Sequence, residues 1–422
     1  MVRTILGTVA AWVCLGTMIG AAQTMRQEPA SQKPFFDARN HQTQYAGPGR
    51  EDPAPADISE VRIGYFGPSD PAHPRGGDMW SAAQMAVREA NARGGYRGKP
   101  FRLVPAWSEN PWGTGVAQVA RMVYKERVWA IIGGIDGPST HLAEQVVAKA
   151  RLVLLGPAST DKTVNLANVP WMFSCVPGDH LQAPVLAAET SARAGQKPFV
   201  LLSATDHDSH LFTVELEKCL AKHRMVPFLR FECEPAAQNV SELARRVAAS
   251  PAGAAVLIAG ADDSARLVVA LRGEGFRGDV FGGPAMGQRR FLEEAEAGAE
   301  GVVFPLLYHG DGPGGCEAKP AQSPSRKFAE EFRSLHGRSP DYLAAHTYDA
   351  VGMLIAAIDK AGLNRARIRD ALADVSPWAG VTGTITWDSL GANARSVRLG
   401  TVNDGRLIFV SGPRAPGAST SR

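Results

Sequence analysis

The strongest constraint on the fold is a regular alternation of short apolar runs with segments of helical periodicity, which starts at Val61. Val61–Phe66 alternates and ends in a Gly-Pro loop, and apolar residues then recur at helical spacing over 78–93. The pattern continues with predicted strands at 101–104, 128–132 and 152–155 and predicted helices at 116–126 and 140–150. Short buried strands that alternate with helices predict a parallel sheet covered by helices on both faces.

A second run of the same kind begins at residue 199. Its predicted strands lie at 199–202, 227–231, 254–259 and 280–281, and its predicted helices at 211–223, 240–249 and 264–273. Helices at 326–336 and 342–361, a strand at 383–387 and a hairpin around Asn403-Asp404-Gly405 follow. A chain of 422 residues, 45% of them hydrophobic, is long enough for two such units. The predicted fold class is therefore α/β, with two Rossmann-like lobes built on parallel sheets.

Composition excludes several classes of function. The net charge is +3 and no block of Lys and Arg occurs, so no nucleic-acid partner is expected. Five cysteines without a C-x-x-C motif exclude a disulfide scaffold, a zinc ribbon and a thioredoxin-type site, and leave open whether Cys219 and Cys233 pair. Gly310–Gly315 spells G-x-G-x-x-G, but the residues after it do not open a helix, so we expect a surface loop and no cofactor.

The N-terminus has the sequence pattern of a secretion signal. Arg3 precedes an uncharged run, Ile5–Ala22, which ends in small residues. Residues 1–22 are therefore expected to be a cleaved signal peptide or an uncleaved membrane anchor, and both place the body of the chain outside the cytoplasm. The polar, turn-rich segment 23–57 is expected to be a flexible tether, and 411–422 a disordered tail.

Two loops that follow predicted strands are rich in Gly, Ser and Thr. They span 133–140 and 156–161, and ligands of open α/β sheets bind beyond the carboxyl ends of the strands. The free N–H groups of a helix start suit an anionic ligand group, although Ser139 and Ser159 are equally suited to plain helix capping. His207 and His210, with acids beside them, would suit a metal ion or a polar loop with a helix cap. We assign no metal ligand and no catalytic residue.

Several short motifs carry a family resemblance. They are Ile63–Pro68, Glu89–Gly95, Ile131–Gly134, Gly137–Thr140, Pro157–Thr160, His346–Ala350 and Gly383–Asp388. In their order and spacing they resemble the type I periplasmic binding proteins, in the leucine/isoleucine/valine-binding branch of ABC-transporter substrate-binding proteins. The resemblance spans about residues 58–410.

The resemblance implies two lobes that are joined by three crossings and close on a ligand like a hinge. Residues 58–180 with 305–380 would form the first lobe, and 181–304 with 381–410 the second. The chain would be a monomeric receptor that delivers a small polar ligand (an amino acid, an amide or a short carboxylate) to an ABC permease. The alternatives are a ligand-sensing module on the same fold and, in third place, a metal-dependent enzyme. The expected ligand-binding residues are Trp107, Asp136, Gly137, Ser139, Thr140, Ala158, Ser159, Thr160, Asp206, His207, Asp208, Asp262 and Ala285.

The chain departs from the family pattern at positions that matter for an amino-acid ligand. A loop serine of many amino-acid binders appears as Gly137, and the second-lobe acid that neutralises the ligand ammonium falls at Ala285. Because an unpaired buried ammonium is costly, either Asp262 or Asp208 takes over, or the ligand is not an ordinary α-amino acid.

Overall fold

The structure, a computed structural model, describes residues 45–195, 197–310 and 323–410, all within one compact unit that starts at Ala38. The predicted signal peptide or anchor, the tether up to residue 44, most of the Gly310–Gly315 motif and the tail lie outside these residues. Within the described ranges, no helix has the length and apolar character needed to cross a membrane.

The first lobe is built on a five-stranded parallel sheet with the strand order β2-β1-β3-β4-β5. Its strands are β1 (Val61–Phe66), β2 (Phe101–Ala106), β3 (Ala130–Gly133), β4 (Val153–Gly156) and β5 (Met172–Ser174). The central strands β3 and β4 are buried at every position. This explains why the sequences of β3 and β4 are continuous apolar runs, as expected for strands that are covered on both faces.

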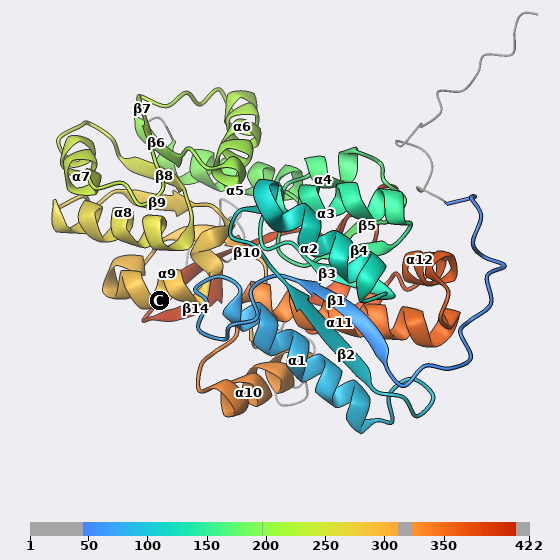
Figure 1. Ribbon diagram of the computed structural model, residues 1–422. Helices are drawn as coiled ribbons and strands as arrows, with labels where there is room; N and C mark the ends of the chain where they lie inside the picture. Colours follow the sequence, from blue (N-terminus) through green and yellow to red (C-terminus); the bar gives the residue numbers. More distant parts are fainter. Residues whose placement is uncertain (1–44, 196, 311–322, 411–422) are drawn as a thin grey trace, which may run out of the picture. The chain divides into compact units, whose positions relative to one another are not determined.

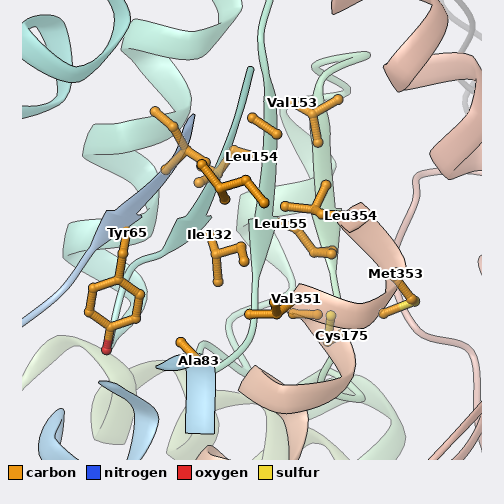
Figure 2. Packing of buried hydrophobic residues seen from close by; sticks show 14 of the residues in the cluster. Tyr65, Ala83, Ile132, Val153, Leu154, Leu155, Cys175, Val351, Met353 and Leu354 are labelled. Carbon is orange, nitrogen blue, oxygen red and sulfur yellow. The ribbon is translucent and has the colours of Figure 1, made fainter. Parts of the chain in front are cut away.

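Helices cover both faces of this sheet (Figure 1). The longest, α11, lies beside α1, while α2 and α3 lie on the opposite face. Figure 2 shows Val351 and Leu354 of α11 packed close to Leu155 of β4, in the core of the lobe. Each fully buried side chain of this size contributes roughly 1.5–3 kcal/mol to folding. The helices of the lobe are α1 (Gly77–Ala92), α2 (Val116–Ala120), α3 (Gly137–Ala150), α4 (Thr163–Leu166), α10 (Pro324–His336), α11 (Tyr342–Ala361) and α12 (Arg365–Ala373).

The second lobe is built on a seven-stranded mixed sheet with the order β14-β13-β10-β9-β8-β6-β7. Strands β6 to β10 are parallel, and β13 and β14 add an antiparallel edge. The strands are β6 (Phe199–Ala204), β7 (Leu229–Cys233), β8 (Ala254–Ile258), β9 (Asp279–Gly282), β10 (Val303–Leu306), β13 (Arg398–Asn403) and β14 (Arg406–Phe409). The helices are α5 (Asp179–Ala194), α6 (His207–Lys222), α7 (Val240–Ala248), α8 (Ala261–Gly273) and α9 (Arg289–Ala295).

The chain passes between the two lobes three times. We locate each passage where consecutive buried residues belong to the cores of different lobes. These places are between Val176 and Ala183, between Leu306 and Leu307, and between Ile385 and Leu399. The short hairpin of β11 (Trp378–Gly380) and β12 (Gly383–Ile385) packs with the first lobe through Ile385, so residues 381–385, which were expected in the second lobe, lie in the first. The two-lobed α/β fold with three crossings is as predicted.

Two local expectations are wrong. The start of the described chain is not a free tether, because Arg50 forms an ion pair with Asp370 at 2.8 Å and the Tyr45 ring lies 4.5 Å from that of Trp171. Helix α6 starts at His207 rather than at 211, because the Asp206 carboxylate accepts the N–H of Ser209 (3.1 Å) and caps it there.

Candidate functional site

A cavity of about 70 Å³ lies between the lobes, beyond the carboxyl ends of strands from both sheets. Five of the predicted binding residues line it: Ala158, Thr160, Asp206, Asp208 and Ala285. The principal further lining residues are Arg75, Phe212, Ile258, Gln288 and Tyr342. The cavity thus combines apolar walls with a small number of charged and hydrogen-bonding groups, as ligand sites commonly do.

The lobes touch on both sides of this cavity. On one side the Nζ of Lys162, in the first lobe, lies 2.6 Å from the Glu215 carboxylate of α6. On the other side the guanidinium of Arg289, in α9, lies 2.9 Å from the Asp78 carboxylate of α1. The structure therefore represents a closed arrangement of the two lobes.

The start of α3 is a capping structure rather than a set of free ligand contacts. Asp136 caps the helix by accepting the Ser139 N–H at 2.9 Å, and the Ser139 hydroxyl accepts the Ile135 N–H at 3.0 Å. The Thr140 hydroxyl donates to the Asp136 carbonyl at 2.7 Å. Ser139 and Thr140 are fully buried and do not line the cavity. Their polar atoms stabilise the loop that shapes the site.

Gly137 brings the two lobes together. Its N–H, one of the free donors at the start of α3, donates to the Asp208 carboxylate of the second lobe at 3.0 Å. A Cβ at position 137 would lie 2.4 Å from Asp208 Oδ1. A glycine at position 137 therefore makes room for an acid from the opposite lobe.

Asp208 is the charged group whose protonation is most altered at the cavity wall. Burial raises the pKa of its carboxyl to about 6, and the nearby Asp136 carboxylate acts in the same direction. The Arg75 charge and the Gly137 N–H lower the pKa of Asp208 and only partly offset these effects. A cationic group in the cavity would stabilise the ionised form of the Asp208 carboxyl.

Thr160 and Ala158 form the first-lobe wall. The Thr160 carbonyl accepts the Asp179 N–H at 2.8 Å, and burial raises the pKa of the Asp179 carboxyl well above its usual range. The neighbouring Ser159 turns away, since its hydroxyl accepts the Asp161 N–H at 3.2 Å and it lines a separate depression. Ser159 and Thr160 are neighbouring hydroxyl residues that the sequence analysis predicts equally, but of the two only Thr160 lines the cavity.

The lining residues that the sequence analysis does not predict include Arg75, Gln288 and Tyr342. Arg75 lies in the loop before α1, with its Nη1 3.4 Å from Asp136 Oδ2. Gln288 of the second lobe donates to the Tyr342 hydroxyl of the first lobe at 3.2 Å. Arg75 follows the first strand, as ligand residues of such sheets often do, whereas Tyr342 and Gln288 meet only because the lobes close.

Two predicted residues lie away from the cavity. The Trp107 indole donates to Glu109 at 2.7 Å and its ring lies 5.4 Å from that of Phe66, so it packs within the first lobe. The Asp262 carboxylate is half exposed and pairs with Arg290 at 2.6 Å. Asp262 is thus engaged with a cation and does not line the cavity.

His207 contacts the first lobe at the edge of the cleft, away from His210. Its Nε2 lies 3.0 Å from Asp161 Oδ2, and the Nε2 of His141 lies 2.9 Å from the same oxygen. Hydrogen bonds to Asp161 and Glu144 raise the pKa of His141 to about 9. His210 is exposed and takes no part in this group.

The two cysteines whose pairing the sequence left open, Cys219 and Cys233, are free buried thiols.

Comparison with known proteins now identifies the family. The family model described as "Periplasmic binding protein" matches residues 60–406, which span both lobes and all three crossings. The chain belongs to the periplasmic binding protein family. Members of this family are solute-binding proteins rather than enzymes, and the family implies a location outside the cytoplasm.

Individual relatives agree with this assignment. An amino acid binding protein of Pseudomonas aeruginosa is 30% identical over 129 residues, which are 30% of this chain and 34% of that protein. The match thus spans only about a third of the relative. The substrate-binding protein LivJ of a branched-chain amino acid transporter from Streptococcus pneumoniae, solved with isoleucine, has a TM-score of 0.75 at 20% identity, over 83% of this chain and 99% of that chain.

A third relative extends the range of ligands within the fold. A solute-binding protein of an ABC transporter from Rhodopseudomonas palustris, solved with benzoate, has a TM-score of 0.72 at 12% identity, over 83% of this chain and 95% of that chain. At such identities the structural likeness establishes the fold of this periplasmic binding protein, and its ligand has to be argued from the cavity.

Proposed function

We propose that this chain is an extracytoplasmic receptor that captures a small zwitterionic ligand of the amino-acid type between its lobes and delivers it to an ABC permease. One observation carries the proposal: a cation of the first lobe, Arg75, and an acid of the second lobe, Asp208, line the same cavity. A ligand that bears both a carboxylate and an ammonium group would complement both.

The size of the cavity favours a small ligand. A volume of about 70 Å³ holds roughly five water-sized groups, since one water needs about 10–15 Å³ measured in this way. We therefore expect amino acids with short side chains, or their amides, rather than aromatic acids.

Asp208 takes the role of the missing second-lobe acid in this proposal. Asp262 is engaged with Arg290 outside the cavity, whereas Asp208 borders it. Charge-assisted hydrogen bonds of an ammonium to this carboxylate would be worth roughly 1.5–3 kcal/mol each.

A thermal-shift screen of the purified chain tests the proposal. The panel contains small amino acids, their amides, and acids of the same size that lack the amine. A ligand at about 100 times its dissociation constant stabilises the protein by roughly 2.7 kcal/mol, which gives a measurable shift in Tm. We expect a shift with an amino acid. A shift confined to acids without an amine would refute the zwitterion, and denaturing mass spectrometry would detect a ligand that co-purifies.

The proposal also includes the oligomeric state of the chain and its attachment to the membrane. The chain acts as a monomer, held outside the inner membrane by an uncleaved N-terminal segment or released by its cleavage. Loss of uptake of the identified ligand on deletion of the gene would support transport, and unchanged uptake would favour a sensing role.

A further inference from the structure

Three polar side chains from distant parts of the chain converge at the edge of the cleft. His141 comes from α3, Asp161 from the loop after β4, and His207 from the first turn of α6 in the other lobe. One ligand atom from each of the three lies within 4.8 Å of the others. Both imidazoles direct Nε2 at the same carboxylate oxygen, Asp161 Oδ2, at 2.9 and 3.0 Å.

A second layer of contacts fixes this arrangement. The other oxygen of Asp161, Oδ1, accepts both the N–H and the hydroxyl of Thr163 at 2.7 Å, so Oδ2 faces the two histidines. Behind His141, the Glu144 carboxylate lies 3.5 Å from Nδ1. A carboxylate behind the second nitrogen of a histidine is the usual support of a metal-bound imidazole.

Glu144 supplies an independent sign that this cluster is built around a ligand. Its side chain is only 5% exposed, and its Oε1 has no hydrogen-bond partner among the described residues. A buried carboxylate is costly unless a positive charge lies near it. Without a metal ion the protonated His141 ring supplies that charge, and an ion bound to Nε2 would supply it in place of the proton.

We propose that His141, Asp161 and His207 bind a late first-row divalent transition-metal ion, with zinc as the probe. Two imidazole nitrogens and one carboxylate oxygen are donors that such ions accept, and they leave a fourth position for water. Donors about 2.0–2.1 Å from a tetrahedral ion lie roughly 3.3 Å apart, so each imidazole nitrogen needs to move only a few tenths of an ångström away from Asp161 Oδ2. The metal would displace the protons that now lie between the imidazoles and the carboxylate.

The position of the ion would give it a structural effect. His141 and Asp161 belong to the first lobe and His207 to the second, so the ion would join the lobes when they are closed. The side chain of His207 is 41% exposed, which gives the ion a path from solvent. Zinc should therefore favour the closed arrangement, whatever ligand the cavity holds.

Titration of the tag-free full chain, stripped with a chelator, with zinc chloride tests the site. Calorimetry should show one zinc ion per chain, and calcium and magnesium should not bind, because hard cations prefer oxygen ligands. The variant His207→Ala should lose at least tenfold in zinc affinity. His210→Ala is the matched control, since it removes an exposed imidazole one turn further along the same helix and should bind zinc as the wild type does.

Two further measurements separate a true site from adventitious binding. Cobalt in place of zinc should give the intense visible absorption of a tetrahedral ion in the wild type and in His210→Ala, but not in His207→Ala. Glu144→Gln should lower zinc affinity by about 10–100-fold while the ligand atoms stay in place. The proposal is overturned if zinc does not bind, or if His207→Ala and His210→Ala bind it equally, with unchanged circular dichroism showing that both variants are folded.

Discussion

The polar residues on the two sides of the cavity have different roles in the two lobes. On the first-lobe side, the hydroxyls of Ser139 and Thr140 are buried and bonded to the Asp136 cap, so they shape the loop. On the second-lobe side, Asp208 borders the cavity with a carboxylate whose pKa is displaced by burial. A loop rich in Ser and Thr can therefore serve the fold rather than the ligand, and in the proposed function the charges that select the ligand are Arg75 and Asp208.

Replacing Asp208 by asparagine tests this contrast most strongly. The amide oxygen can still accept the Gly137 N–H, so closure is preserved while the charge is lost. For a zwitterionic ligand we expect the affinity to fall by roughly 10–100-fold, or about 1.5–3 kcal/mol. Calorimetry with the ligand identified in the screen measures the change. Unchanged affinity would show that the second lobe does not supply the counter-ion.

Acidification gives a second test of the same carboxylate. Because the pKa of Asp208 is raised to about 6, only about a tenth of the carboxyls are ionised at pH 5, so ligand affinity should fall roughly tenfold between pH 7 and pH 5. The ligand-free closed form should respond in the opposite sense. The stability that this group contributes is fully present below its ordinary pKa of 3.8 and is lost as the pH rises through about 6.

Measuring Kd and Tm of the ligand-free protein across this range, for the wild type and Asp208→Asn, would separate the two effects. The variant should show a flatter profile in both. Equal slopes for the two proteins would assign the pH dependence to another group.

The first-lobe wall should show a smaller effect, at one position only. Thr160 lines the cavity and Ser159 does not. Thr160→Val keeps the shape and removes the hydroxyl, so affinity should fall by about 2–10-fold, or roughly 0.5–1.5 kcal/mol. Ser159→Ala is its neighbour and control, and its ligand affinity should match that of the wild type. Similar losses in both variants would mean that the loop acts as a unit.

The sequence predicts the architecture better than the site. Strands such as β3 and β4 are detectable because burial on both faces makes them uniformly apolar. Helix α5 escaped prediction because Pro184 lies inside it and its buried face consists largely of small residues. Proline is unfavourable within a helix, and only the completed fold shows that it is tolerated here.

The site depends on contacts that no local pattern contains. Ser139 and Ser159 have the residue types of a ligand loop, and their hydrogen-bond partners alone show that they stabilise turns. The meeting of Asp208 with Gly137 requires the lobes to close, so sequence spacing carries no signal for it. The sequence does show the departure at Ala285, which leaves open either a different counter-ion or a ligand that is not an ordinary α-amino acid.

We expect the smallest effect for Asp262, a predicted binding residue that does not line the cavity. Asp262 is 52% exposed and pairs with Arg290 on the surface of the second lobe. Exposed ion pairs contribute roughly 0–1 kcal/mol, so Asp262→Asn should change the free energy of unfolding by less than about 1 kcal/mol and leave ligand affinity unchanged. Urea unfolding and calorimetry on this variant, beside Asp208→Asn, measure both quantities. Asp262, Arg290 and Arg75 line a depression next to the cavity. A loss of affinity in Asp262→Asn as large as in Asp208→Asn would mean that the ligand reaches this depression and that its counter-ion lies there.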